Sequence, residues 1–138
     1  MPNYWVLKTE PGSYSFDRLV RERRAVWDGV TNAVALKHIR GMTKGDHAFI
    51  YHTGDEKALV GLARVVSDPY PDPKGDDPKL VVIEIEAGAR LTHPVALAAI
   101  KADPNLADLP LVRLPRLSVG PVPPEQWRRL IAMGEGSA

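Results

Sequence analysis

The sequence contains no cysteine among its 138 residues. Without thiols it can form no disulfide framework, use no thiolate nucleophile and build no sulfur-ligated zinc site. It also lacks an apolar run of the roughly 20 residues that a membrane span requires. Neither the basic region nor the apolar region of a secretory signal is visible near its N-terminus. We therefore expect a cytoplasmic protein, free or associated with the nucleoid, that has no membrane partner.

Catalytic and metal-binding signatures are missing as well. The patterns GxSxG, GxxxxGK[ST], GxGxxG and HExxH do not occur, and no two of the four histidines are four residues apart. A metal site needs several ligands at suitable spacing, so we expect neither a metal nor a cofactor. Ser118, His52 and Asp28 could assemble a catalytic triad in space, but a chain of this size commonly offers such a set.

The composition is that of an ordinary globular protein, with 44% hydrophobic and 25% charged residues. The length suits one domain spanning residues 1–138, with residues 134–138 expected to form a frayed tail. The net charge is +1, with basic residues in excess toward both ends and acidic residues in the middle. This distribution fits a nucleic-acid binder and an ordinary solvated surface equally well.

Hydrophobic periodicity predicts the order of helices and strands. Ser15 and Asn32 can cap helices, the second of which ends at Arg40 before a left-handed Gly41. Prolines exclude regular structure from the segment 68–78. Further helices are expected at 94–101 and 124–133, and strands at 4–10, 48–53, 59–66, 80–85 and 111–119. Because strands and helices do not alternate, we expect an α+β fold whose small, mostly antiparallel, barrel-like sheet carries peripheral helices.

The segment Trp27-Asp28-Gly29-Val30 is the principal candidate site. A large aromatic ring followed by an Asp-Gly turn and by Asn32 brings a stacking surface close to backbone and side-chain amides. These groups can hold a planar heteroaromatic ring by stacking and by hydrogen bonds to its edge. Taken alone, the same residues are also typical of a core tryptophan at a turn.

The segment Lys8-Thr9-Glu10 is a second candidate. In a strand Lys8 and Glu10 share one face and Thr9 points to the other. A small hydrolase that used all three residues would need them to converge, which this alternation opposes. Solvated charges at a strand end are the simpler interpretation.

These segments occur together with others in an order that resembles the EVE domain family, that of thymocyte nuclear protein and its bacterial relatives. The resemblance covers Tyr4 to about Ile131. It depends on Tyr4-Trp5, Lys8-Thr9-Glu10-Pro11, Trp27-Asp28-Gly29-Val30 with Asn32, Gly45-Asp46, Tyr51-His52-Thr53, Val60-Gly61, Pro71-Asp72, and Arg116-Leu117-Ser118-Val119 with Pro121-Val122.

The resemblance implies a PUA-like pseudo-barrel and a non-catalytic pocket that accepts one modified base. Modified cytosine in DNA is the favoured ligand, with RNA as an alternative, and a nucleic acid carrying that base would be the partner. Carried over by position, the implied pocket is lined by Lys8, Glu10, Pro11, Trp27, Asp28, Gly29, Val30, Asn32, His52, Thr53 and Ser118.

The sequence departs from the family pattern directly after the WDGV segment. Thr31 and Leu36 stand where arginines are common, Ala33 replaces an aromatic residue, and Thr9 replaces a serine. Fewer arginines there predict weaker phosphate contacts beside the pocket. Two alternatives remain open: a small PUA-like hydrolase acting on modified nucleosides, and a protein-interaction module with a vestigial pocket.

Overall fold

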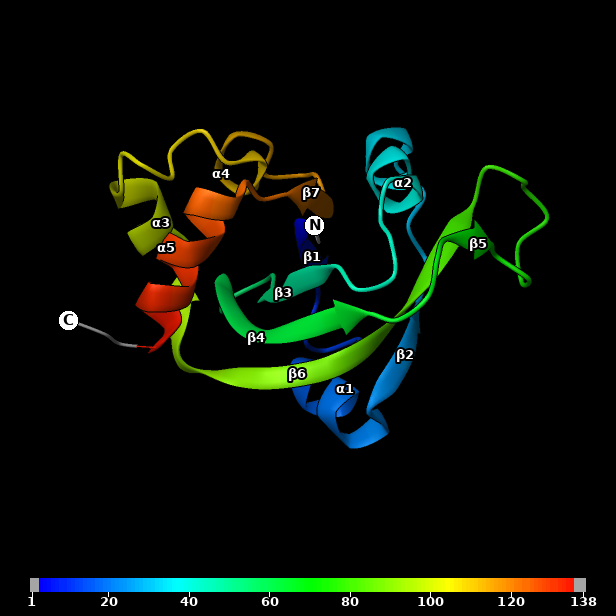
Figure 1. Ribbon diagram of the computed structural model, residues 1–138, viewed down its shortest axis with the longest axis horizontal. Coiled ribbons are helices and arrows are strands. Elements are labelled where there is room, and N and C mark those ends of the chain that lie inside the picture. The colour runs from blue at the N-terminus through cyan, green and yellow to red at the C-terminus, as the bar shows by residue number, and fades with distance from the viewer. Residues whose placement is uncertain (1–2, 136–138) are drawn as a thin grey trace.

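The structure is a computed structural model that describes residues 3–135 (Figure 1). Gly134 and Glu135, which were expected to belong to a frayed tail, lie in the last helix, and residues 136–138 lie outside the described residues. In chain order the elements are β1 (Tyr4–Thr9), α1 (Phe16–Glu22), β2 (Arg24–Trp27), α2 (Ala33–Arg40), β3 (His47–His52), β4 (Ala58–Val65), β5 (Tyr70–Pro71), β6 (Val81–Ala96), α3 (Leu97–Ala102), α4 (Pro110–Arg113), β7 (Val119–Pro121) and α5 (Pro124–Glu135).

A single sheet organises the chain, and it confirms the expected α+β, mostly antiparallel architecture. Its strand order is β2-β6-β4-β3-β1-β7, with β5 attached to β6. Among the strands of residues 3–135, β1 and β3 alone pair in parallel. The sheet curls into a half-barrel whose two edges are β2 and β7.

Irregular pairing in the middle of the sheet accompanies its curvature. The register between β4 and β6 shifts on both sides of Gly61, and such bulges bend a strand and increase its twist. A side chain at Gly61 would force Phe16 to shift, because a Cβ there would lie 2.3 Å from the Phe16 ring. Gly61 thus lets Phe16, the first residue of α1, pack directly against the sheet.

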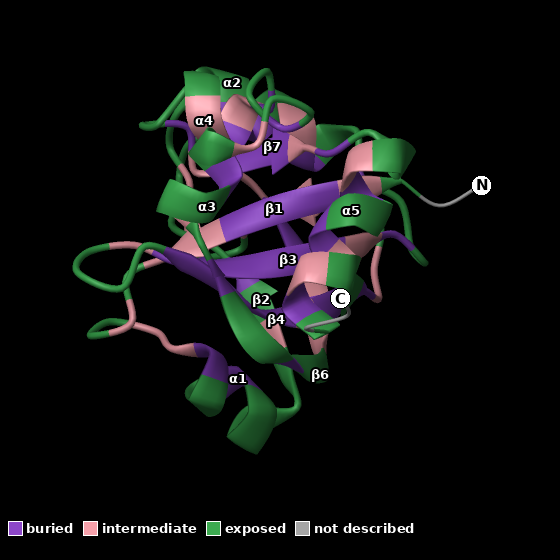
Figure 2. Cartoon of the chain, turned by 90° about the vertical axis from the view of Figure 1, so that its left-hand side faces the viewer, coloured by how far each residue is buried: buried purple, intermediate pink, exposed green. Residues whose placement is uncertain are grey.

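The sheet separates two hydrophobic cores. Side chains of β1 alternate between them, since Trp5 and Leu7 join one core and Val6 joins the other. The first core is covered by α1 and α2. The second lies beneath α3, α4 and α5, where Trp127 packs on Phe49 with ring centroids 4.2 Å apart. Figure 2 shows the buried strands β1 and β3 in the middle of this arrangement.

A buried carboxylate fixes the beginnings of β1 and β3. Asp46 is fully buried and accepts hydrogen bonds from Asn3 N, Trp5 Nε1, Thr43 N and Thr43 Oγ1 at 2.9–3.0 Å. Burial by itself raises the pKa of Asp46, but these four donors outweigh it and hold the pKa below its usual value.

The two predicted helix caps are confirmed. Ser15 accepts from Arg18 N at 3.1 Å, and Asn32 accepts from the first backbone amides of α2. The predicted left-handed conformation of Gly41 is wrong, because its φ is −86°. The α2 helix therefore ends through ordinary right-handed geometry, with the Gly41 amide bonded to carbonyls of the last turn.

The structure differs from the predicted elements in several places. The segment 68–78 is not free of regular structure, because Tyr70–Pro71 form the short strand β5, which pairs with Val82 and Val81 of β6. The strand expected at 80–85 is longer than predicted and runs from Val81 to Ala96.

The segment 111–119 is not a strand: Pro110 starts the short helix α4, and β7 begins only at Val119. Pro is favoured in the first turn of a helix because its missing amide is not needed there. The expected helix at 94–101 begins later, at Leu97, because β6 continues to Ala96. Pro94 is tolerated in β6 because it falls where the pairing with β4 is interrupted.

Candidate functional site

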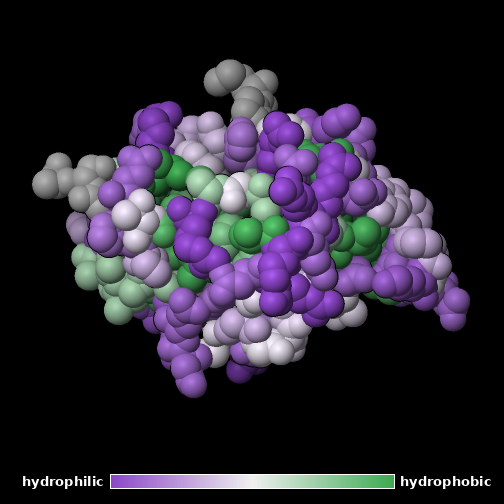
Figure 3. Space-filling model, turned by 90° about the horizontal axis from the view of Figure 1, so that it is seen from below, coloured by the Kyte–Doolittle hydropathy of each residue, from purple (hydrophilic) through white to green (hydrophobic). Residues whose placement is uncertain are grey.

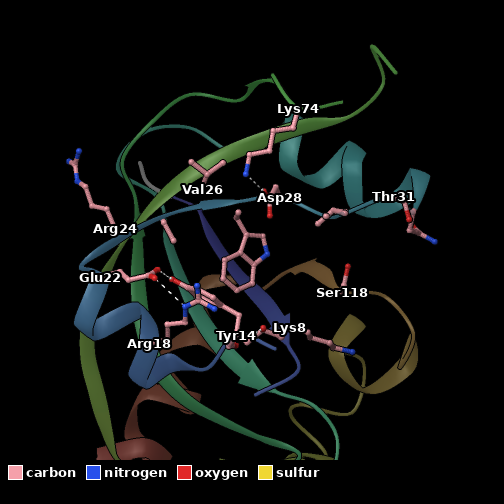
Figure 4. A pocket seen from close by; sticks show the side chains of 16 residues that line it. Lys8, Tyr14, Arg18, Glu22, Arg24, Val26, Asp28, Thr31, Lys74 and Ser118 are labelled. Carbon is pink, nitrogen blue, oxygen red and sulfur yellow. Dashed lines mark hydrogen bonds and ion pairs between the residues drawn. The ribbon is translucent and has the colours of Figure 1, made fainter. Parts of the chain in front are cut away.

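A cleft of about 680 Å³ opens where the two edges of the curled sheet approach each other. Strand β2 and Ser118, the residue before β7, both line it although their strands lie at opposite ends of the strand order. Figure 4 shows the cleft and the side chains around it. The lining residues are Lys8, Thr9, Tyr14, Arg18, Glu22, Arg24, Ala25, Val26, Trp27, Asp28, Gly29, Val30, Thr31, Asn32, Lys74 and Ser118.

Trp27 belongs to both the cleft and the core. Its side chain is only 8% exposed, and it packs in the core cluster that α1 and α2 cover. The ring of Tyr14 meets it edge to face, with centroids 6.1 Å apart and an interplanar angle of 86°. The pair forms an aromatic wall that is held rigidly from behind.

The turn after β2 presents a carboxylate at the cleft. Gly29 has a φ of +79°, a conformation that glycine adopts without the steric cost of a side chain. Asp28 is half-exposed, and its Oδ2 lies 3.7 Å from Lys74 Nζ. Figure 4 shows Lys74 reaching from the β5–β6 loop toward Asp28. Because both side chains are well exposed, the pair is weak and can be exchanged for ligand contacts.

Asn32 offers the cleft a hydrogen-bond donor of fixed orientation. Its Oδ1 accepts from Val34 N at 2.9 Å and from Ala35 N at 3.0 Å. Since the carbonyl end of the amide is used by this cap, the amino end is the part left for a ligand. Because Asn32 caps α2, it can contact a bound ligand only as a hydrogen-bond donor, through its amino group.

A polar network fixes Tyr14 at the cleft wall. Tyr14 Oη donates to Glu22 Oε1 at 2.7 Å, Arg18 Nε donates to Glu22 Oε2 at 3.1 Å, and the Arg18 guanidinium lies over the Tyr14 ring. Burial, followed by the hydrogen bond to Glu22, raises the pKa of Tyr14 to about 12. The hydrogen bonds from Tyr14 and Arg18 lower the pKa of Glu22. Near neutral pH the tyrosine is thus a neutral phenol and the glutamate a carboxylate.

Lys8 and Ser118 border the cleft from β1 and from the approach to β7. They are joined by a backbone hydrogen bond from Lys8 N to Ser118 O at 2.9 Å. Lys8 Nζ donates to Pro115 O at 3.0 Å and lies 5.6 Å from the centre of the Tyr51 ring. Burial lowers the pKa of Lys8. The hydroxyl of Ser118 points toward the side of the cleft on which Asp28 and Thr31 lie (Figure 4).

Seven of the eleven residues expected in the pocket line the cleft: Lys8, Trp27, Asp28, Gly29, Val30, Asn32 and Ser118. The other four do not. His52 is buried, accepts from Phe16 N through Nε2 and approaches Glu56 at 2.7 Å through Nδ1, so it supports the start of α1. Thr53 lines a separate cavity on the other side of Lys8. Glu10 and Pro11 lie in the turn after β1, where the Glu10 carboxylate accepts from Gly12 N.

Several lining residues were not predicted from the sequence. Tyr14, Arg18 and Glu22 recur every four residues, a spacing that places them along one side of a helix and its approach. That spacing could have indicated a common surface. Lys74 carried no comparable signal, since the position of a proline-rich loop is set by the rest of the fold. The remaining unpredicted residues are Thr9, Arg24, Ala25, Val26 and Thr31.

Residues 3–135 contain no cluster of three His, Asp or Glu side chains suited to a metal ion. The same part of the chain contains no helix that is both long and apolar enough to cross a membrane.

Nearly the whole chain resembles proteins of known sequence and structure. A sequence model of the EVE domain matches residues 3–133. Thymocyte nuclear protein 1 of Mus musculus is 27% identical over 98% of this chain and 75% of its own length. The structure of Rpa0253 from Rhodopseudomonas palustris is 40% identical, covers 99% of this chain and 95% of its own, and superposes with a TM-score of 0.92. A crystal structure of human THYN1 with DNA containing 5-methylcytosine shares the fold at 24% identity, with a TM-score of 0.88 over 96% of this chain and 98% of its own.

Proposed function

The chain belongs to the EVE domain family, and from that membership we propose that it binds a modified cytosine of DNA in the cleft between β2 and β7. The human THYN1 protein, which has the same fold, was crystallised with DNA containing 5-methylcytosine. A base inside a duplex is not accessible to such a cleft, so the nucleotide would be turned out of the helix or presented in a single strand.

The observation that carries the proposal is the set of groups gathered at the cleft. Asp28 supplies an acceptor, Asn32 supplies a donor whose direction is fixed by its cap, and Ser118 supplies a hydroxyl. The pairing edge of cytosine presents one amino donor and two acceptors, and carboxylates are suited to accept from that amino group. The groups of the cleft and of the base are therefore complementary.

The shape of the cleft supports a ligand of this size. Its volume of about 680 Å³ lies within the range of small-molecule sites. Trp27 and Tyr14 supply aromatic surface, and Val26, whose side chain is 46% exposed, supplies an apolar contact for a substituent on the base. The open volume also favours a working site over the alternative of a vestigial pocket in a protein-interaction module.

The alternative of a hydrolase finds less support in the geometry. Thr9 Oγ1 donates to Tyr14 O at 2.7 Å, Glu10 turns back to Gly12 N, and Lys8 Nζ donates to Pro115 O. Because these side chains diverge, they form no common reaction centre. A triad of Ser118, His52 and Asp28 is opposed in the same way, since both ring nitrogens of His52 are engaged away from the cleft.

The test measures binding by fluorescence anisotropy at several stated salt concentrations. The probes are a labelled duplex with one 5-methylcytosine, the same duplex with cytosine, and an RNA strand of the same sequence. We expect preference for the methylated duplex. Equal and purely salt-driven binding to both duplexes would overturn the proposal, and preference for the RNA would replace DNA as the partner.

The variant Asn32→Asp separates base reading from folding. Aspartate caps a helix as well as asparagine does, so the unfolding temperature should be preserved. The donor becomes an acceptor, however, and binding to the methylated duplex should fall roughly tenfold or more. Asn105→Asp, which adds the same charge beside the second core, is the matched control and should bind like the parent. Replacement of Trp27 by alanine is unsuitable here, because a large cavity in the core costs about 3–5 kcal/mol.

A further inference from the structure

An arginine-rich surface begins inside the cleft and continues over α1 and the neighbouring strands. We define it as the arginine face, comprising Arg18, Arg21, Arg23, Arg24, Arg64 and Arg90. Arg18 and Arg24 line the cleft itself. Figure 3 views the molecule from the side on which α1 lies and shows hydrophilic side chains on either side of a small hydrophobic patch near the middle.

Ion pairs link four of these arginines to neighbouring elements. Glu86 on β6 lies 3.4 Å from Arg24 Nε and 3.3 Å from an Arg64 terminal nitrogen, so it bridges β2 and β4. Arg90 on β6 pairs with Asp17 on α1. With Glu22 included, four of the six arginines pair with three carboxylates, and Arg21 and Arg23 form no salt bridge with a described residue. The pairs are exposed and therefore weak, and each guanidinium has donors to spare for another anion.

Arg23 has a positive φ, a backbone conformation that favours glycine. Helix α1 ends at Glu22 and β2 begins at Arg24, so one residue must reverse the chain. Arg23 does so with a φ of 67°, fixed by bonds from its amide to Leu19 O and from Ala87 N to its carbonyl. Glycine would adopt this conformation at lower cost. The fold explains the unusual backbone but not why an arginine side chain stands there, exposed beside the cleft.

We propose that the arginine face binds the phosphodiester backbone of the nucleic-acid strand whose base enters the cleft, and this inference rests on the function proposed above. Arg18 of α1 and Arg24 of β2 place this positive charge on the wall of the cleft itself, where a strand would pass if its base occupied the cleft. Phosphate contacts of this kind position a strand and do not read its sequence.

The test uses the double variant Arg21→Gln with Arg23→Gly, because these two arginines form no salt bridge with a residue of the described chain. The probes are the methylated and unmethylated duplexes, each titrated at several salt concentrations. Each lost phosphate contact should reduce the slope of log affinity against log salt by about 1, so we expect a reduction of about 2 with both probes. The preference for the methylated base should stay as in the parent.

Two controls make the result decisive. Arg128→Gln removes an exposed arginine from α5, which packs on the second core, and should leave the slope unchanged. Arg23→Gly alone should unfold at the same or a higher temperature than the parent, because it relieves the positive φ; weaker binding then cannot result from misfolding.

An unchanged slope in the double variant, or an equal reduction in Arg128→Gln, would overturn the inference and leave the face to an acidic protein partner. Failure of the proposed function has a different result: the parent protein would bind the methylated and unmethylated duplexes with equal affinity.

Discussion

At the scale of single residues, Asp46 links the electrostatics of the chain to its stability. Its carboxylate is fully buried, and its donors come from the beginning of β1 and from the turn before β3. A buried anion is costly unless hydrogen bonds replace its hydration, and here four donors do so. The Gly45-Asp46 segment therefore stabilises the fold and does not line the cleft. It nevertheless belongs to the set of segments that resembles the EVE domain.

We expect Asp46→Asn to lower the free energy of unfolding at pH 7 by about 3 kcal/mol, because an amide places donors opposite donors. The folded-state pKa of Asp46 is lowered, so its stabilisation is complete above the unfolded pKa of about 3.9 and is lost as the pH falls through the folded value. Urea unfolding of parent and variant from pH 7 to pH 2 should therefore show the difference shrinking in acid. Asp76→Asn, in an exposed loop, is the control; a difference that stays constant with pH would contradict this account.

At the scale of elements, the docking of α1 on the sheet determines one wall of the cleft. Phe16 begins the helix and is fully buried against Gly61 of β4. His52 accepts the Phe16 amide and so holds the same helix end. Tyr14, Arg18 and Glu22 reach the cleft only because this end is fixed, and Asn32 fixes α2 on the opposite wall by its cap.

We expect Gly61→Ala to destabilise the protein by about 2–3 kcal/mol, because the added methyl group overlaps the Phe16 ring and overpacking costs that much. Phe16→Leu should also be destabilising by itself. Combined, the two changes should cost less than their sum, since the smaller side chain leaves room for the methyl group. Thermal and urea unfolding of the three variants provide the double-mutant cycle, and strictly additive costs would show that the close approach has no energetic effect.

At the scale of the whole molecule, one sheet supports both cores. Because β1 sends alternate side chains into each, neither core can lose its packing without disturbing the strand that the other uses. Tryptophans report on both sides: Trp5 and Trp27 lie in the first core and Trp127 in the second.

We expect unfolding in urea to be one cooperative transition. The variant Trp5→Phe with Trp127→Phe leaves Trp27 as the reporter, and Trp5→Phe with Trp27→Phe leaves Trp127. In each variant the fluorescence midpoint should coincide with the midpoint from far-UV circular dichroism, as two-state unfolding requires. Fluorescence of the Trp127 reporter that changes well before the dichroism would indicate that the second core unfolds independently.

Local sequence signals were sufficient for much of the fold. The caps Ser15 and Asn32 and the α+β architecture follow from side-chain chemistry and from the period of apolar residues, which act over a few neighbours. The strand predicted at 111–119 failed because alternating apolar residues also fit a short helix opened by Pro110. The strand predicted at 80–85 continues as β6 to Ala96. This extension was missed because most of its residues are exposed and show no apolar period, and because the bulge that tolerates Pro94 is not visible in the sequence.

For the site, the sequence by itself determined the central segment: Trp27, the Asp28-Gly29 turn and Asn32 are adjacent in the chain, so their placement depends on local geometry. Only the tertiary structure decided what surrounds it. The curl of the sheet brings β2 to Ser118 from the opposite edge, and the docking of α1 adds Tyr14 and Arg18. The docking of α1 also engages His52, whose ring accepts a hydrogen bond from Phe16 N and does not face the cleft. Such choices depend on bulges and on packing between segments far apart in sequence, and no local pattern contains them.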